Sequence, residues 1–103
     1  MKKTGWIMAA CLLMSGATSF AQAGADTYKT KCQMCHGAAG MADTGAGKAM
    51  KVKPVTDPDV KKMDEPAMVA AVKNGSGKMQ PFAGKLTDAQ ITGTVSYFRT
   101  FIK

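Results

Sequence analysis

Cys32, Cys35 and His36 stand in the spacing C-x-x-C-H, which brings two thiols and one imidazole together within five residues. On a helix, residues three and four positions apart share a face, so all three side chains can point at one flat ligand. The two thiols can add to the two vinyl groups of a porphyrin, while the imidazole binds its iron. The spacing therefore predicts a covalently bound haem c, with Cys32 and Cys35 as tethers and His36 as an axial iron ligand.

The same pair of cysteines has two other readings. It also occurs in dithiol oxidoreductases and as half of a structural zinc site. A thioredoxin-like dithiol is surrounded by a βαβ frame, and a structural zinc ion takes four ligands. After Gly24 the chain offers only two cysteines and one histidine. Both alternatives stay open, but haem attachment fits these residues best.

A methionine in a glycine-rich segment is the candidate for the second iron ligand. Residues 75–82 read GSGKMQPF, in which the glycines let the backbone approach a flat cofactor and the proline stiffens the loop. The soft thioether of Met79 suits low-spin iron. Met41 and Met50, in a second glycine-rich stretch over residues 37–53, are rival ligands. The simplest alternative for Met79 is a core-filling methionine.

The first 23 residues are typical of a secretory signal peptide. Lys2 and Lys3 form a positive n-region, residues 6–14 form an apolar stretch, and residues 21–23, AQA, offer a small-x-small cleavage site. The apolar stretch is shorter than the roughly 20 residues that a membrane-spanning helix needs. We therefore expect residues 1–23 to be removed on export and the protein to reside in the periplasm.

Cleavage after residue 23 leaves a single domain, residues 24–103, which is 80 of the 103 residues. A domain of this size buries only a modest core, so a haem would serve as the apolar centre of its packing. We expect no transmembrane segment in the mature form. Cys11 is a weaker candidate for lipidation, because the apolar run continues through residues 12–14 beyond it.

The charge of the chain bears on its partners. The chain has 14 basic and 7 acidic residues, and removal of Lys2 and Lys3 lowers the formal net charge from +7 to +5. The lysines expected to border the cofactor are Lys29, Lys31, Lys48, Lys51, Lys53, Lys78 and Lys85. Such a basic face would steer the protein to acidic patches on redox partners, although a merely solvated lysine-rich surface is an equal alternative. Without arginine clusters or interleaved aromatic residues, nucleic-acid binding is not expected.

Hydrophobic periodicity predicts helices and no strands. A first helix carries Tyr28, which is expected in the core, and leads into the cysteine motif. Asp57 resembles an N-cap before a short helix that runs through Met63, and a further helix restarts at Asp64 and stops at residues 74–75, Asn-Gly. Residues 37–53 are expected to form a loop.

The closing helix has the clearest signals. Thr87 and Gln90 form a capping box at its start. Apolar residues recur at helical spacing, namely Ile91, Val95, Phe98 and Ile102. Gly93 interrupts this helix at a cost on the order of 1 kcal/mol against alanine, which indicates that another helix, most simply the first, crosses closely there.

Taken together, these residues resemble class I cytochromes c of the short bacterial monohaem type. The resemblance spans the predicted mature chain: the motif at residues 32–37 after a helix with Tyr28, the methionine loop at residues 74–82, and a closing helix with Tyr97. It implies an all-α, cytochrome c-like fold wrapped around one covalently bound haem, with the N- and C-terminal helices crossing. It also implies His36 and Met79 as axial ligands, and electron transfer as the task.

One feature departs from that family. In many members a glycine-proline pair soon after the motif places a backbone carbonyl on Nδ1 of the ligand histidine. Here the first proline after His36 is Pro54. A carbonyl from residues 41–53 is the candidate for the missing acceptor.

The expected function is that of a periplasmic electron carrier rather than an enzyme, present as a monomer or as a complex subunit. One alternative is a haem protein with an open or labile sixth site, peroxidase-like or gas-sensing. After residue 23 the chain has no histidine besides His36, and Arg99 is predicted on the last helix, so distal acid-base groups are missing. The other alternative is a fixed subunit of a larger oxidoreductase complex.

Overall fold

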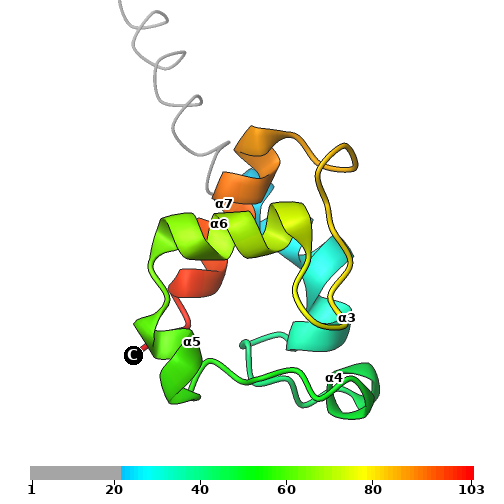
Figure 1. The fold of residues 1–103 in the computed structure, drawn as a ribbon, viewed down its shortest axis with the longest axis vertical. Helices are drawn as coiled ribbons and strands as arrows, with labels where there is room; N and C mark the ends of the chain where they lie inside the picture. Colours follow the sequence, from blue (N-terminus) through cyan, green and yellow to red (C-terminus); the bar gives the residue numbers. More distant parts are fainter. Residues whose placement is uncertain (1–21) are drawn as a thin grey trace, which may run out of the picture.

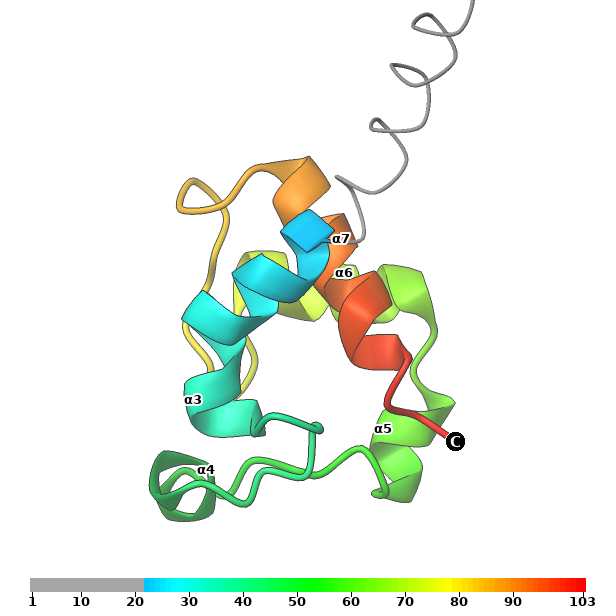
Figure 2. The ribbon, with the colours of Figure 1, turned by 180° about the vertical axis from the view of Figure 1, so that it is seen from behind.

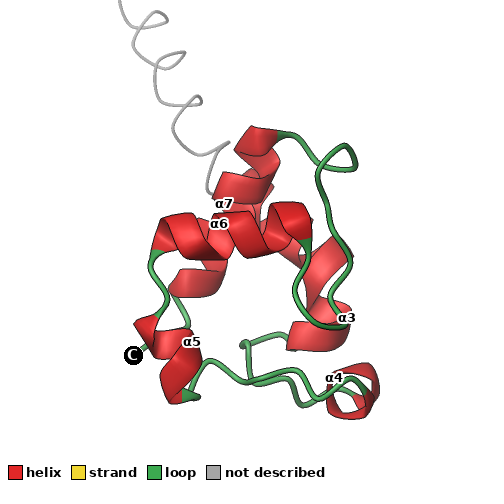
Figure 3. Ribbon diagram, in the orientation of Figure 1, coloured by secondary structure: helices red, strands yellow, loops and turns green. Residues whose placement is uncertain are grey.

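The computed structural model describes residues 22–103, so Cys11 and all of the predicted signal peptide except residues 22 and 23 lie outside the described part. Residues 22–27 are helical and continue into η1 (Tyr28–Cys32), which is followed by α3 (Gln33–His36), α4 (Gly45–Ala49), α5 (Pro58–Lys62), α6 (Glu65–Asn74) and α7 (Asp88–Arg99). Within residues 22–103 there is no strand, only two isolated bridges (Figure 3). The prediction of an all-helical chain is confirmed.

Helix α7 connects the two halves of the fold. It packs against both α6 and η1, while α3 packs against η1 and α4. Figures 1 and 2 show the helices arranged around the middle of the molecule, with α6 and α7 at one end and α3, α4 and α5 at the other. The segment that carries the cysteine motif is therefore held from one side by the closing helix and from the other by α4.

Two glycines allow the N-terminal helix to cross α7 closely. A Cβ atom at Gly24 would lie 2.5 Å from the carbonyl oxygen of Gly93, a distance that real side chains do not tolerate. A Cβ atom at Gly93 would lie 3.5 Å from Cα of Gly24, which is ordinary van der Waals contact. The close crossing predicted at Gly93 is confirmed, and its partner is the first helix, at Gly24.

The core centres on Tyr28 and Ile91, whose side chains are 1% and 0% exposed. The Tyr28 ring packs against the end of α7, with ring centroids 5.4 Å from Tyr97 and 5.5 Å from Phe101. The predicted core position of Tyr28 is thus confirmed. The apolar residues Ile91 and Val95 of α7 also face the core, as predicted. Ile102 was predicted to continue the apolar face of this helix, but it lies outside the helix, which ends at Arg99 and is followed by a turn.

The predicted helix ends are also confirmed. The Asp57 carboxylate accepts from Asp59 N–H at 2.8 Å at the start of α5. Thr87 Oγ1 accepts from Gln90 N–H at 3.1 Å while Gln90 Oε1 accepts from Thr87 N–H at 2.9 Å, which completes the capping box of α7. Helix α6 stops at Gly75, whose φ of 82° is a conformation that glycine adopts without strain.

One local prediction was wrong, and the predicted first helix is present with a local irregularity. Residues 37–53 contain helix α4 rather than only a loop, because the Thr44 hydroxyl accepts from Gly47 N–H at 2.9 Å and caps it. The first helix is not regular either: residues 28–32 form a π-helical turn in which Gln33 N–H donates to the Tyr28 carbonyl. Single π turns of this kind occur often at functional sites.

The crossing predicts unequal effects of alanine at its two glycines. Gly24→Ala should lower the free energy of unfolding by about 1–3 kcal/mol, because its methyl group overpacks against the α7 backbone. Gly93→Ala has room for the methyl group and should leave stability unchanged or raise it by about 1 kcal/mol through helix propensity. Chemical denaturation of the haem-loaded protein measures both, and equal losses at the two sites would contradict the crossing geometry.

Candidate haem site

The cysteine motif lies across the junction of η1 and α3. Cys32 ends η1, and Cys35 and His36 end α3; all three side chains are half-buried, and both thiols are free. The surrounding elements are helices, not the βαβ frame of a thioredoxin-like dithiol. In residues 22–103, no group of three or more His, Cys, Asp and Glu side chains is placed to hold a metal ion.

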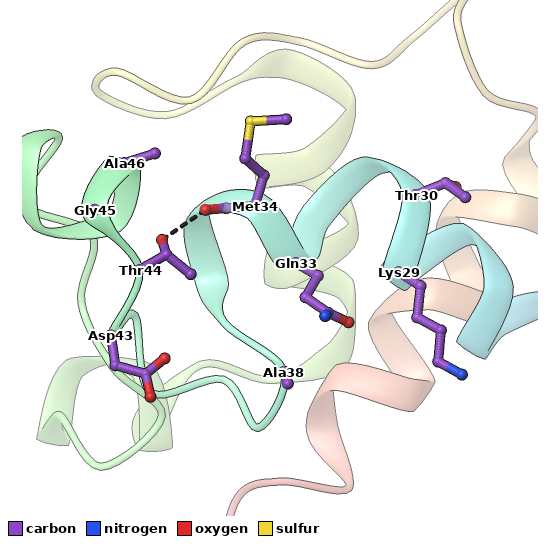
Figure 4. A pocket seen from close by; sticks show the side chains of 9 residues that line it. All are labelled: Lys29, Thr30, Gln33, Met34, Ala38, Asp43, Thr44, Gly45 and Ala46. Atoms are coloured by element: carbon purple, nitrogen blue, oxygen red, sulfur yellow. Dashed lines mark hydrogen bonds between the residues drawn. The ribbon is translucent and has the colours of Figure 1, made fainter.

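Thr44 and Gly47 fix the backbone of the motif from the α4 side. The Thr44 hydroxyl donates to the Met34 carbonyl at 2.6 Å while accepting from Gly47 N–H, so one side chain joins the end of α3 to the start of α4 (Figure 4). Gly47 lies so close to the carbonyl oxygen of Cys35 that any Cβ atom would overlap it. The backbone at Cys35 is therefore held by a contact that only glycine permits.

Tyr28 fixes the turn that follows His36. Its phenol donates a hydrogen bond to the Gly37 carbonyl, and the next turn is closed by Ala42 N–H, which donates to the His36 carbonyl at 2.8 Å. Burial raises the pKa of the Tyr28 phenol well above its ordinary value, so the hydroxyl stays protonated as a donor. Periodicity predicted only the burial of Tyr28. The hydrogen bond to Gly37 could have been anticipated only from the hydroxyl group, since a buried tyrosine O–H needs a hydrogen-bond acceptor.

The two cysteine sulfurs have different neighbours. Cys32 Sγ lies 3.7 Å from Oγ1 of Thr94, a residue of α7 that is only 2% exposed, and burial raises the pKa of the Cys32 thiol. Cys35 Sγ lies 3.9 Å from Sδ of Met50. Met50 therefore lies beside Cys35. Met41, the other rival ligand, is 42% exposed.

The His36 imidazole is packed against α7. Its ring centroid lies 5.3 Å from that of Phe98, at an interplanar angle of 67°. Burial lowers the pKa of the His36 imidazole, which favours the neutral form that binds metals. Nδ1 of His36 is buried without a hydrogen-bond partner, and no other side-chain N or O atom in the described residues is in this state.

The expected acceptor for that nitrogen is absent from the described structure. We expected a carbonyl of residues 41–53, and Nδ1 of His36 meets none. Helix α4 directs several carbonyls of this segment to its own backbone: its hydrogen bonds and the turn after it use those of Thr44, Ala46, Gly47 and Lys48.

The Met79 loop is anchored on the end of α6. Phe82 N–H donates to the Val72 carbonyl at 2.9 Å and Ala83 N–H to the Lys73 carbonyl at 3.2 Å, so the returning chain satisfies carbonyls that the last helical turn leaves free. Phe82 is buried and holds this return in the core. Figure 1 shows the loop running from the end of α6 to the level of α3 and back to α7.

Within the loop, Met79 closes a tight turn whose tip is formed by Gly77 and Lys78. Met79 N–H donates to the Ser76 carbonyl at 2.9 Å, and Ser76 N–H donates to the Met79 carbonyl at 3.2 Å. The turn begins at Gly75, where a Cβ atom would lie 2.8 Å from the Met79 carbonyl oxygen. Met79 itself is half-buried. Its backbone is thus fixed independently of the cysteine motif.

An open hollow of about 680 Å³ lies on the outer face of the motif (Figure 4). Its lining consists of Lys29, Thr30, Gln33, Met34, Ala38, Asp43, Thr44, Gly45 and Ala46. It includes the two residues between the cysteines, Gln33 and Met34, but neither cysteine nor His36, so it is separate from the predicted tethers and histidine ligand. Met34 is 73% exposed at its edge.

The comparisons with known proteins agree with this arrangement. A family model described as "Cytochrome C oxidase, cbb3-type, subunit III" matches residues 19–98. The chain belongs to this cytochrome c family. The cytochrome is 35% identical to cytochrome c6 of Leptolyngbya boryana over 77 residues, which are 75% of this chain and 87% of that protein. Its fold is similar to that of the c-type cytochrome KustC0563, with a TM-score of 0.70 and 27% identity, over 78% of this chain and 98% of the other.

Members of this family carry covalently attached haem c with iron, so haem c is the cofactor of this cytochrome and electron transfer is its general task. The predicted cytochrome c-like helical fold is confirmed. The residues present suit the group: two free thiols at the required spacing and a neutral imidazole beside them. Among residues 22–103, no helix is long and apolar enough to cross a membrane.

The contact between Gly47 and Cys35 predicts a selective effect on haem attachment. Gly47→Ala should displace the backbone of the motif, lowering the yield of haem-loaded protein and its free energy of unfolding, the latter by about 1–3 kcal/mol. Gly45→Ala is the matched control in the same helix, because a Cβ atom there meets no atom within 4 Å. Absorbance per protein and chemical denaturation give the two readouts; equal yields for both variants would refute the proposed contact.

Proposed function

We propose that this cytochrome is a periplasmic carrier of single electrons, in which Cys32 and Cys35 hold the haem and His36 and Met79 are the axial ligands. When bound, the haem supplies an iron that alternates between the ferric and ferrous states. The observation that supports the proposal is the pairing of a rigid C-x-x-C-H segment, with a neutral imidazole, and a methionine loop anchored separately on α6.

The protein's own residues set the conditions for that chemistry. The two thioethers would keep the cofactor permanently in one orientation. A methionine ligand raises the reduction potential relative to a more basic ligand, and buried apolar residues such as Phe82 and Val95 exclude water and raise it further. Because the motif and the Met79 turn are each fixed by their own backbone hydrogen bonds, both ligands should keep their positions in the two oxidation states.

Visible spectra test the ligand assignment. The wild-type protein should keep its haem through acid-acetone extraction, show a thioether-to-iron charge-transfer band when ferric, and bind carbon monoxide slowly or not at all when ferrous. Met79→Ala should lose the band and bind carbon monoxide promptly, because it opens the sixth site.

Met50→Leu and Met41→Leu are the controls, since they alter the two rival methionines and should behave as the wild type. Loss of the band in either control would move the ligand to that residue. Prompt binding of carbon monoxide by the wild type would favour an open-site haem protein instead of a carrier.

Some of the lysines expected to border the haem are already engaged by other side chains of the protein, and others are not. Lys53 forms an ion pair with Asp59 at 2.8 Å, and Lys85 Nζ donates to Gln80 Oε1 at 2.9 Å. Lys29, Lys31, Lys48, Lys51 and Lys78 are exposed and form no ion pair within residues 22–103. The proposed docking surface for acidic redox partners consists of these exposed lysines, whose long-range attraction would raise encounter rates.

Salt-dependent kinetics test this surface. Lys29→Gln and Lys48→Gln should slow electron transfer to membranes of the source organism at low ionic strength, and the difference should vanish as salt rises well above ~0.1 M, where the Debye length is ~10 Å. Lys53→Gln changes the net charge equally but removes a lysine that is already paired, so it should slow transfer less. Identical rates and salt slopes in all three variants would remove the docking proposal.

The family description also supports a second role, that of a subunit held in an oxidase complex. Gentle detergent extraction of native membranes, followed by size-exclusion chromatography, distinguishes the two roles. A free carrier elutes alone, near its own size, whereas a fixed subunit elutes with the complex.

A further inference from the structure

The imidazole of His36 lacks the hydrogen bond that usually fixes a metal-ligating histidine. Such a histidine generally donates its outer ring N–H to a carbonyl, a carboxylate or water, which sets the ring orientation and raises its basicity. Here Nδ1 of His36 is the one buried side-chain N or O atom in residues 22–103 without any partner. The orientation of the His36 ring must therefore be fixed by a contact other than a hydrogen bond from Nδ1.

The carbonyls nearest in sequence are engaged elsewhere. The His36 carbonyl accepts from Ala42 N–H, and the Gly37 carbonyl accepts from the Tyr28 phenol. The Gly40 carbonyl accepts from Val55 N–H at 2.9 Å. The chain after the motif is therefore folded onto itself and onto Tyr28, and none of its carbonyls meets Nδ1 of His36.

Phe98 is the side chain that packs against the ring. Its centroid lies 5.3 Å from that of His36 at 67°, an edge-on arrangement that has a preferred angle. Phe98 is itself held by Tyr28 and Phe101, with centroids 6.1 and 6.3 Å away. Gly40 backs the cluster: a Cβ atom there would lie 3.3 Å from Phe98 and 3.1 Å from Phe101. Phe98 thus presents a fixed edge to the imidazole.

We propose that Phe98 is a positioning residue for the iron-ligating imidazole, which it orients by aromatic packing in place of a hydrogen bond from Nδ1. The inference rests on the proposed function only in taking His36 as a ligand. It has two consequences. The plane of the imidazole depends on Phe98, and His36 is a weaker electron donor than a hydrogen-bonded histidine, which favours the ferrous state.

Proton NMR of the ferric, haem-loaded protein tests the first consequence, because the paramagnetic shifts of the haem methyl groups report the plane of the axial imidazole. Phe98→Leu should change the order or spread of these shifts. Phe101→Leu should not, although it removes a ring from the same cluster and lowers stability as well. Phe98→Tyr keeps the ring edge and should retain the wild-type pattern even if Phe98→Leu fails to load haem.

An added acceptor tests the second consequence. Phe98→Gln offers an amide oxygen where the ring stood, and its reduction potential should fall below that of Phe98→Leu, because a hydrogen bond from Nδ1 strengthens the imidazole as a donor. Equal potentials in these two variants would show that Nδ1 already has an acceptor, such as an ordered water, and would overturn the inference.

The two proposals fail in different ways. If the wild type lacks the thioether-to-iron band, the proposed axial ligation is wrong. If that band is present but Phe98→Leu and Phe101→Leu shift the methyl resonances alike, the ligation stands and only the role of Phe98 is refuted.

Discussion

The buried ring of Tyr28 is the contact on which the rest of this structure depends. Its phenol holds the Gly37 carbonyl directly after the haem-binding segment, and its ring packs against Tyr97, Phe98 and Phe101 near the end of α7. One side chain therefore joins the N-terminal helix, the turn after His36 and the closing helix. Because the crossing at Gly24 and Gly93 brings those helices close, the tyrosine can reach both neighbours at once. The position of the imidazole follows from this arrangement of backbone and aromatic rings.

The two halves of the proposed iron site are built on different supports. The cysteines and His36 are fixed by α4 and α7, whereas Met79 is fixed by hydrogen bonds to the end of α6. Helix α7 contacts both η1 and α6, so it sets the relation between the two supports. Such a division would suit an electron carrier, since neither proposed ligand would have to move when the charge on the iron changes.

Much of this could be predicted because it depends on local chemistry. The caps at Asp57 and Thr87 and the close approach at Gly93 are properties of single residues in a helix, and the structure bears out all three. The motif at residues 32–36 was likewise readable from spacing alone. Helix α4 was missed because its five residues, GAGKA, carry no apolar period, and only Thr44 marks its start. The bond of Tyr28 and the unpaired Nδ1 of His36 depend on contacts between distant segments, which spacing does not encode.

With Met79 as the proposed axial ligand, the return of its loop to α6 would couple ligand exchange to the fraying of that helix. Phe82 and Ala83 complete the hydrogen bonding of the last turn of α6, so a foreign ligand that pulled the loop away would expose the Val72 and Lys73 carbonyls as well as the iron. Each such bond contributes about 1 kcal/mol. If Met79 binds the iron as proposed, these hydrogen bonds would help to retain its sulfur, and a substitution that unfolds the end of α6 would weaken that ligation without touching the site.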